Sequence, residues 1–408
     1  MRKMTLGDVA EYVNGRAFKP EEWEEDGKPI LRIQNLTNST EVCHKTTRTY
    51  ESKYFVQSGD LLFAWSASLG AYIWQGGDAW LNQHIFKVMP FAFMEKKYLF
   101  YYLVHMIDEL YEKTHGSAMV HITRKTFQSM PIPVPPLAEQ QRIVERIEGL
   151  FSKLDAAREN AQSVLDGAAT RKAAILHRAF SGDLTRQWRE DNGLSDSERK
   201  TVTVASVCHS LKYGTAKKSA KTGNVVVLRM GNLQGGEIDW SNLAYSNDEE
   251  DNEKYSLSPG DVLFNRTNSP ELVGKTSIYR GEFPAIYAGY LIKLDYNRDI
   301  ISGEYLNYML NSPEAKEYCK AVKTDGVNQS NINAKRIGAF LIPLPSLQEQ
   351  EETAKRLQSI LRKELQASEA ARQVLDNIDA MKRVILGRAF RGELGTNRPS
   401  EAAPEASR

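Results

Sequence analysis

The chain has 408 residues and a formal net charge of +1 at pH 7; 41% of its residues are hydrophobic and 26% are charged. This length is too great for one compact core, so we expect two domains with connecting elements. The near-neutral charge excludes a histone-like protein that coats nucleic acid. It leaves room for a shaped groove with basic walls, because acidic clusters elsewhere offset basic surfaces.

Residues 1–135 are predicted to form a first domain of mixed α/β (α+β) class. Runs of β-branched and aromatic residues predict strands at 31–33, 60–65 and 84–88. An amphipathic pattern predicts a helix near 98–112, after the strands.

Residues 136–184 are predicted to form a long helix. Its apolar residues alternate in spacings of four and three with one break, at Arg171, which is typical of a coiled-coil seam. Prolines precede the helix and Gly182 suits a left-handed cap at its end. The predicted seam consists of Ile143, Ile147, Leu150, Leu154, Ala157, Ala161, Val164, Ala168 and Ile175.

A polar linker, residues 185–200, is expected to lead to a second mixed domain, residues 201–342. This domain has the same kinds of pattern in the same order as the first. The predicted strands lie at 225–230, 261–264 and 290–294, and the predicted helix lies near 303–322.

Residues 343–395 are predicted to form a second long helix, which ends near Gly392 and has Glu364 as the break in its seam. Residues 396–408 have the composition of a disordered tail. The predicted seam consists of Leu357, Ile360, Ala367, Ala371, Val374, Ile378, Met381 and Ile385.

The chain contains an internal repeat. Residues 133–184 align with residues 343–394 without a gap, and both segments contain Pro-x-Pro-x-Leu-x-Glu-Gln near the start and Arg-Ala-Phe near the end. The domains share landmarks as well, since Gly-Asp before an apolar strand occurs at 59–60 and again at 260–261. We therefore expect two copies of one fold, joined by two long helices that pair antiparallel around a pseudo-twofold axis.

Catalytic and metal-binding motifs are missing from the sequence. There is no Asn/Asp-Pro-Pro-Tyr motif and no glycine-rich loop for S-adenosylmethionine, and the Gly274-Lys275-Thr276 run lacks the earlier glycine of a phosphate-binding loop. The three cysteines are far apart without CxxC spacing, which predicts free thiols and no metal site. The chain shows no signal peptide and no stretch that could span a bilayer, so we expect a cytoplasmic protein.

Polar loops recur at corresponding places in the two domains. Asn and Gln can form bidentate hydrogen bonds with adenine, Arg with guanine, and Ser and Thr with bases or phosphates. Each residue alone is equally compatible with an ordinary turn, but two matched sets favour DNA recognition. The candidates are Ser66, Ser68, Asn82, Gln83, His84, His121, Arg124 and Lys125 in the first domain and Asn265, Arg266, Thr267, Asn268, Asn328, Gln329, Asn331 and Lys335 in the second.

Four segments of the sequence form a recognisable set: Trp65-Ser66-Ala67-Ser68-Leu69-Gly70, Leu81-Asn82-Gln83-His84-Ile85-Phe86-Lys87-Val88, Phe264-Asn265-Arg266-Thr267-Asn268-Ser269 and the run from Pro131 to Val144. In these segments the chain resembles the specificity subunit of type I restriction-modification enzymes, and the resemblance covers the whole chain apart from the linker and tail. The proline-to-Glu-Gln helix start, present twice, is its most specific part.

The resemblance implies two target recognition domains that each read half of a bipartite sequence in double-stranded DNA. It also implies that the two helices set the gap and that the chain has no catalytic activity and no cofactor of its own. Two methylase (M) subunits would supply S-adenosylmethionine chemistry, and endonuclease/translocase (R) subunits would use ATP and Mg. We expect methylase contacts on exposed helix faces and at Arg178, Phe180, Arg388 and Phe390, although these helix ends could equally pack against the chain's own domains.

Two other functions are compatible with parts of the sequence. The near-neutral charge would suit a coiled-coil scaffold that holds two protein partners without reading DNA. A self-sufficient nuclease or methyltransferase is disfavoured, because the motifs for either activity are missing.

Overall fold

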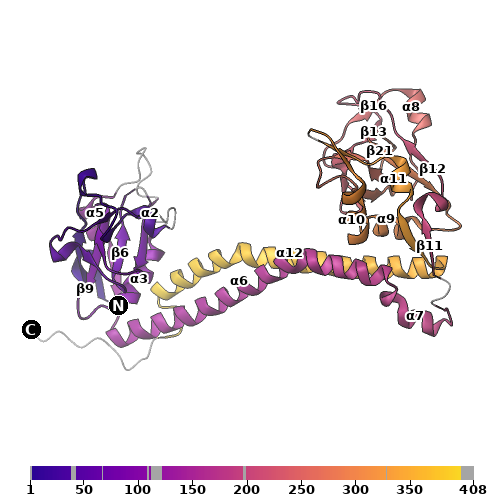
Figure 1. Ribbon diagram of the computed structural model, residues 1–408. Helices are drawn as coiled ribbons and strands as arrows, with labels where there is room; N and C mark the ends of the chain where they lie inside the picture. The colour runs from indigo at the N-terminus through magenta and orange to yellow at the C-terminus, as the bar shows by residue number, and fades with distance from the viewer. Residues whose placement is uncertain are drawn as a thin grey trace, which may run out of the picture. The chain divides into compact units, whose positions relative to one another are not determined.

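The computed structural model describes residues 2–37, 43–66, 68–107, 110–111, 122–195, 199–327 and 329–396. The chain divides into two compact units (Figure 1). Unit 1 comprises Met1–Gln162 and Arg372–Arg408, and unit 2 comprises Ser163–Ala371. Each unit therefore contains one mixed domain and a part of both long helices.

The domain of unit 1 contains two four-stranded sheets. The first, in the order β2-β9-β6-β7, is antiparallel throughout, and the second, in the order β4-β3-β8-β5, has one parallel pair, β3 with β8. A separate pair, β1 with β10, joins the two ends of the domain. The strands are β1 (Arg2–Thr5), β2 (Ala10–Asn14), β3 (Lys28–Leu31), β4 (Lys45–Thr46), β5 (Phe55–Val56), β6 (Leu61–Ala64), β7 (Gly70–Ile73), β8 (Ala79–Leu81), β9 (Ile85–Pro90) and β10 (Pro131–Val134).

The domain of unit 2 repeats this topology. Its sheet β12-β21-β17-β19 matches β2-β9-β6-β7, its sheet β16-β13-β20 again has one parallel pair, and β11 with β24 matches β1 with β10. It also contains two small sheets, β14-β15 and β18-β23-β22. The strands are β11 (Lys200–Thr203), β12 (Cys208–Tyr213), β13 (Val225–Leu228), β14 (Leu233–Gln234), β15 (Glu237–Ile238), β16 (Tyr245–Ser246), β17 (Val262–Asn265), β18 (Thr267–Asn268), β19 (Thr276–Ile278), β20 (Ala285–Tyr287), β21 (Leu291–Tyr296), β22 (Thr324–Asp325), β23 (Ser330–Asn331) and β24 (Leu341–Leu344).

The turn before the central strand is the same in both units. Gly59 and Gly260 have φ of 88° and 93°, which a residue with a side chain adopts only with strain. The aspartate after each glycine forms an ion pair with a lysine of the neighbouring strand, Lys87 to Asp60 at 2.8 Å and Lys293 to Asp261 at 2.7 Å. The predicted duplication of the fold is thus confirmed at the level of single turns.

Shorter helices complete the two domains. Arg32 is the N-terminal cap of α2, so the predicted strand at 31–33 ends at Leu31. The single helix predicted near 303–322 is two helices, because Pro313 begins a new helix with Ser312 as its cap. The helices are α1 (Leu6–Val9), α2 (Ile33–Leu36), α3 (Lys96–His105), α5 (Arg124–Gln128), α7 (Arg186–Asp191), α8 (Glu249–Lys254), α9 (Gly303–Leu310), α10 (Pro313–Val322) and α11 (Ala334–Gly338).

The long helices are α6 (Leu137–Phe180) and α12 (Leu347–Phe390), each of 44 residues. The glycines predicted to follow them, Gly182 and Gly392, have φ of 91° and 76°, as a left-handed cap requires. No helix within the described ranges is both long and apolar enough to cross a membrane.

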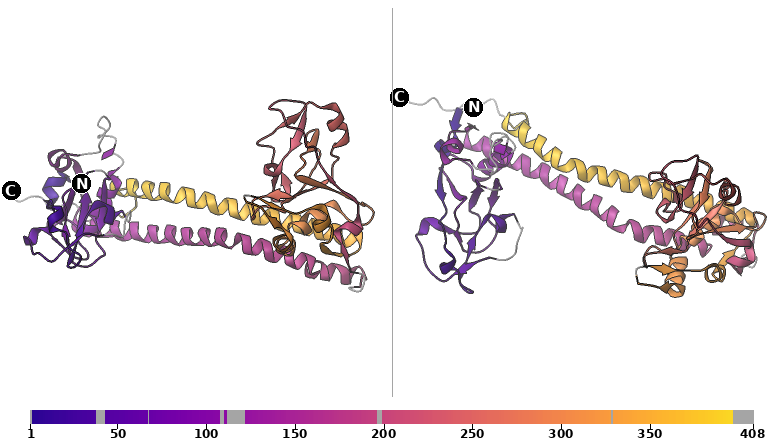
Figure 2. Two further views of the ribbon diagram at one scale, coloured as in Figure 1. Left: turned by 45° about the horizontal axis from the view of Figure 1, so that its top comes forward. Right: turned by 90° about the horizontal axis from the view of Figure 1, so that it is seen from above.

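The two long helices lie side by side and antiparallel within each unit (Figure 2). In unit 1, Arg158 pairs with Asp379 at 2.5 Å and Lys382 pairs with Asp155 at 2.6 Å. In unit 2, Arg171 Nε lies 2.9 Å from Glu364 Oε2. The two breaks predicted in the apolar seams therefore face each other, and their opposite charges pair across the seam.

The predicted seam of α12 is partly wrong. Ala371 and Ile378 are buried as expected, but Val374 and Met381 are 41% and 50% exposed. The less exposed positions in this stretch come one residue later, at Leu375 and Lys382. Because Val374 and Leu375 are both apolar, the spacing alone cannot decide which of them faces the partner helix.

Each long helix is anchored to its unit by the glutamine of the repeated Glu-Gln motif. Gln140 is fully buried; its Nε2 donates to Pro135 O at 2.9 Å and Phe93 O at 3.0 Å, and its Oε1 accepts from Glu95 N at 2.8 Å. Gln350 repeats all three bonds, with Pro345 O, Ile300 O and Ser302 N. Since buried polar groups need partners, these bonds fix where each helix leaves its domain.

The glutamate of the same motif is buried but has different partners in the two units. Glu139 accepts from Thr396 Oγ1 at 2.5 Å and pairs with Arg142 at 2.6 Å. Glu349 lies 2.8 Å from both Arg189 Nη1 and Thr185 Oγ1. Arg189 belongs to α7, inside the segment predicted to be a plain linker, and Thr396 begins the segment predicted to be a disordered tail.

The aromatic residue at each helix end is buried within the chain. Phe180, at the end of α6, packs edge-on against Tyr305 of unit 2, and Phe390, at the end of α12, packs edge-on against Tyr98 of unit 1. Their exposed fractions are 6% and 8%. Contact with a partner protein, which we predicted for both rings, does not fit this burial.

Candidate nucleic-acid interface

In unit 1, the candidate residues after β6 and before β9 lie together. Trp65 N donates to His84 O at 3.1 Å, and its indole stacks on Phe86 with ring centroids 5.6 Å apart. Gln83 is exposed, and the φ of 73° at His84 turns the chain sharply into β9. The fold therefore brings Ser66, Gln83 and His84 to one edge of the sheet β2-β9-β6-β7, where β6 ends and β9 begins.

Two basic candidates of unit 1 lie at the start of α5. Arg124 and Lys125 are both exposed, and the preceding Thr123 caps the helix by accepting from Thr126 N at 3.2 Å. Ile122 N donates to Trp65 O at 3.4 Å, which attaches this segment to the edge described above. Ser68 is exposed and Asn82 is half-buried, whereas His121 lies outside the described residues.

In unit 2, three candidates form one hydrogen-bonded group at the pairing of β18 with β23. Arg266 Nη2 donates to Asn331 Oδ1 at 3.1 Å, and Asn331 Nδ2 donates to Thr267 Oγ1 at 2.9 Å. The guanidinium of Arg266 also lies 4.7 Å from the centre of the Tyr213 ring. These contacts hold the guanidinium in one orientation, as recognition of a guanine edge requires.

Asn265 differs from its neighbours because it is fully buried. Its side-chain oxygen accepts from Thr267 N at 3.2 Å and so shapes the turn that presents Thr267. Direct contact with a base, which we predicted for Asn265, does not fit this position. Asn268 is half-buried, Gln329 and Lys335 are exposed, and Asn328 lies outside the described residues.

The two groups occupy equivalent places in the duplicated fold. Arg266 N donates to Tyr290 O at 3.1 Å as Trp65 N donates to His84 O, and Ile332 N donates to Arg266 O at 2.8 Å as Ile122 N donates to Trp65 O. Trp65 and Arg266 are therefore structural counterparts. A single backbone frame carries an aromatic side chain in one unit and a guanidinium in the other.

The sequence interpretation missed two residues that hold these side chains. Asn14 Oδ1 accepts from Trp65 Nε1 at 3.0 Å, and Tyr213 lies under Arg266. Asn14 ends β2 and Tyr213 ends β12, so the two residues are also counterparts. The signal that could have identified them is the glycine that follows each one, Gly15 and Gly214, at the end of the first strand of each large sheet.

The three cysteines, Cys43, Cys208 and Cys319, are free thiols. Burial raises the pKa of Cys208 to about 12 and that of Cys319 to about 11, so both thiols stay protonated at neutral pH and are poor nucleophiles. Within the described part of the chain, no group of three or more His, Cys, Asp or Glu side chains could hold a metal ion.

The chain belongs to the family described as the type I restriction modification DNA specificity domain, whose profile matches residues 1–163 and 196–375. The function of this class is DNA sequence specificity in a type I restriction-modification system. The two matched segments correspond to the two copies of the fold described above. Nothing in these comparisons favours a scaffold that does not read DNA.

Several curated relatives match almost the whole chain. The EcoBI specificity subunit of Escherichia coli is 24% identical over 412 residues, which cover 96% of this chain and 86% of that protein. The EcoKI specificity subunit of Escherichia coli strain K12 is also 24% identical, covering 95% and 88%. The MjaVIII specificity subunit of Methanocaldococcus jannaschii is 25% identical, covering 91% and 90%.

Two solved structures have a similar fold. The HsdS subunit of Thermoanaerobacter tengcongensis superposes with a TM-score of 0.62 at 18% identity, covering 96% of this chain and 97% of that chain. A chain from a study of complex assembly and conformational transition of the type I R-M system also has a TM-score of 0.62, at 20% identity, covering 96% and 98%.

Proposed function

We propose that this chain reads a bipartite sequence in double-stranded DNA, with one half-site for each domain. The observation that carries the proposal is the duplicated edge, where Trp65 and Arg266 occupy equivalent backbone positions among exposed polar side chains. Because the residues at the two edges differ, the two domains should prefer different base sequences. The exposed Arg124 and Lys335 near these edges have the chemistry for phosphate contacts.

The proposed role of α6 and α12 is to set the gap between the two half-sites. Their equal length and their antiparallel pairing within each unit support this role. Inserting seven residues after Gln162 and seven after Ala371 keeps the heptad pattern of both helices. It adds roughly 10 Å of helix, which corresponds to about three base pairs.

Methylation-site mapping tests this role. The recognised gap should lengthen by about three base pairs in the double insertion variant. The matched control inserts the same residues after Gln162 only. The added turns of α6 then have no partner on α12, so this variant should not recognise the DNA. A double insertion variant that methylates at an unchanged gap would contradict the proposal.

We further propose that the chain has no catalytic activity and works with partner subunits. Two methylase subunits would bring S-adenosylmethionine, and endonuclease/translocase subunits would bring ATP and Mg chemistry. The missing methyltransferase motifs support this assignment. Arg178 and Arg388 are exposed at equivalent helix ends and remain our candidates for methylase contacts.

One experiment tests the central proposal directly. Methylated adenines are mapped in the host genome with this gene present and with it deleted. A split motif that loses methylation only in the deletion strain supports the proposal. Methylation that does not depend on the gene, together with equal binding of the assembled complex to specific and random duplexes, would contradict it.

A further inference from the structure

The segments that follow β2 and β12 begin at equivalent places. Arg16 N donates to Leu81 O at 2.9 Å, and Thr215 N donates to Tyr287 O at the same distance. In turn, Arg16 O accepts from Gln83 N at 2.8 Å, and Thr215 O accepts from Gly289 N at 2.7 Å. In unit 1 the segment therefore starts beside the loop that carries the candidate Gln83. In unit 2 it starts beside the equivalent loop, at Gly289.

The charges of these two segments are opposite. In unit 1, residues 15–26 contain five acidic side chains, and Arg16 is neutralised by Glu22 in an ion pair of 2.8 Å. In unit 2, residues 214–223 contain Lys217, Lys218 and Lys221 and no acidic residue. The next matched contacts are Glu24 N to Lys45 O and Ala220 N to Tyr245 O, so equivalent contacts bound an acidic segment in unit 1 and a basic one in unit 2.

Lys217 forms ion pairs within unit 2. Its Nζ lies 2.8 Å from Asp248 Oδ2 and 3.4 Å from Asp251 Oδ1. Its single positive charge offsets part of the negative charge of these carboxylates, which would otherwise repel a phosphate. The hydrogen bond of Thr215 Oγ1 to Asp251 also fixes the start of the segment.

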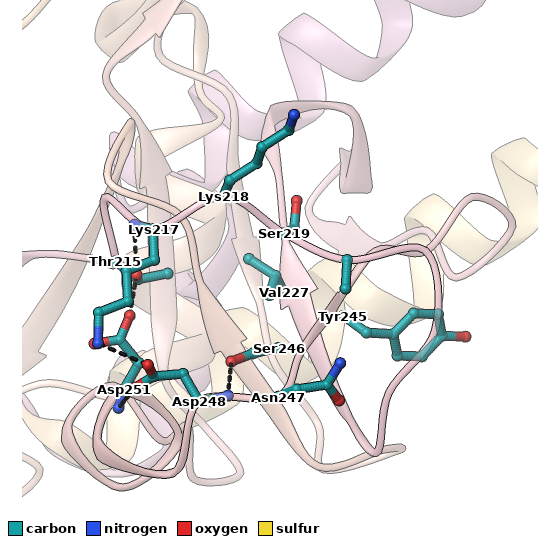
Figure 3. A pocket seen from close by; sticks show the side chains of 11 residues that line it. Thr215, Lys217, Lys218, Ser219, Val227, Tyr245, Ser246, Asn247, Asp248 and Asp251 are labelled. Atoms are coloured by element: carbon teal, nitrogen blue, oxygen red, sulfur yellow. Dashed lines mark hydrogen bonds and ion pairs between the residues drawn. The ribbon is translucent and has the colours of Figure 1, made fainter.

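Lys218 and Lys221 differ from Lys217. Both are exposed, and neither forms an ion pair with any residue of the described part of the chain. Figure 3 shows the Lys218 side chain pointing away from Asp248 and Asp251, whereas that of Lys217 points towards them. The ammonium groups of Lys218 and Lys221 are therefore available to an external anion.

We propose that Lys218 and Lys221 bind phosphate groups of the DNA backbone beside the half-site that unit 2 reads. This inference rests on the proposed function. The segment that carries both lysines starts directly after Tyr213, whose ring lies 4.7 Å from the guanidinium of Arg266, so it begins at the candidate base-reading group. A flexible lysine suits a phosphate, which needs charge rather than fixed geometry.

The measurement is the salt dependence of DNA binding by the full chain assembled with its methylase subunits. Each phosphate contact adds roughly 0.9 to the slope of log K against log salt. The double variant Lys218→Gln/Lys221→Gln should lower this slope by about 2, on specific and random duplexes alike. Lys218→Arg/Lys221→Arg keeps both charges and should keep the slope.

Two controls locate the effect. Lys200→Gln removes an exposed lysine of β11, the strand that pairs with β24, and should leave the slope unchanged. Methylphosphonate groups remove phosphate charge from one half-site at a time. Placed in the half-site whose discrimination is lost in Arg266→Ala, they should abolish the difference between wild type and the double Gln variant.

The outcomes separate the two proposals. A wild-type complex that binds split and random duplexes equally would overturn the proposed function itself. Specific binding with the same slope in the wild type and the double Gln variant would overturn only the lysine assignment. A reduced slope that methylphosphonates in the other half-site cancel would place the lysines on the wrong half-site and overturn it as well.

Discussion

Unit 1 and unit 2 share a backbone frame and differ in the side chains that the frame presents. At one matched edge, unit 1 has an indole stacked on Phe86 and unit 2 has the guanidinium of Arg266 over Tyr213. The backbone hydrogen bonds around both positions are the same. The side chain at this edge therefore differs between the units while the backbone bonds that support it stay the same.

The helix anchors show the same separation of frame and side chain. Gln140 and Gln350 make matching sets of hydrogen bonds, but Glu139 pairs with an arginine of its own helix and Glu349 with Arg189 from α7. The equivalent buried carboxylate is thus neutralised by an arginine from a different element in each unit. Four predictions test how far the two units are equivalent.

The largest expected effect comes from Arg189→Ala. Arg189 and Glu349 are 5% and 3% exposed, so the variant leaves a buried carboxylate without its main partner and should cost about 3 kcal/mol of unfolding free energy. Arg142→Ala in unit 1 should cost about 1 kcal/mol, because the Arg142 side chain is already 20% exposed. Chemical denaturation measures both losses.

The double variant Arg189→Met/Glu349→Gln is the control for the larger stability loss expected in unit 2. It removes both charges together and should recover a large part of the lost stability. Equal losses in Arg189→Ala and Arg142→Ala would show that the two carboxylates are equivalent after all.

The next effect concerns recognition. Arg266→Ala should relax discrimination in one half-site by about 1 to 3 kcal/mol and leave the other half-site unaffected. The reason is the loss of an oriented bidentate donor that Asn331 and Tyr213 hold in place. Binding of the assembled complex to duplexes with single base changes measures it. Equal losses at both half-sites would indicate misfolding instead.

A smaller effect is expected across the helix pair. The coupling energy of Arg171 with Glu364 in unit 2 should be about 0.5 kcal/mol, because both side chains are partly covered. An ion pair between the same two helices in unit 1, Arg158 with Asp379, is more exposed and should show a coupling close to zero. Double-mutant cycles on unfolding free energy compare them, and a stronger coupling in unit 1 would reverse this ranking.

The smallest effect is a pH dependence in unit 1. Hydrogen bonds from Arg16 and Lys19 N hold the pKa of Glu22 at about 2, below its ordinary value of 4.5. Its stabilising contribution is therefore complete above about pH 4.5 and is lost as the pH falls towards 2. Glu22→Gln should flatten the unfolding free energy over this window. An unchanged pH profile would show that the ion pair does not contribute.

Much of the frame could be predicted because its signals are local. The glycines after both long helices, the Gly-Asp turns and the strands near 60–65 and 261–264 all depend on residues a few positions apart. Most candidate loop residues also lie at the two matched edges. Asn265 was misjudged because exposure depends on what packs over a residue, and the sequence of one turn does not contain that information.

The duplication, the mixed domains and the two long helices could be read from the sequence alone, because repeats and periodicity are properties of the linear chain. Packing of the folded chain was needed to show that Leu375 rather than Val374 turns inward, that Glu349 pairs with Arg189 and that Phe180 packs against Tyr305. These contacts join residues that are far apart in the sequence, so they depend on which distant surfaces meet. A one-dimensional pattern shows that a side chain needs a partner without identifying that partner.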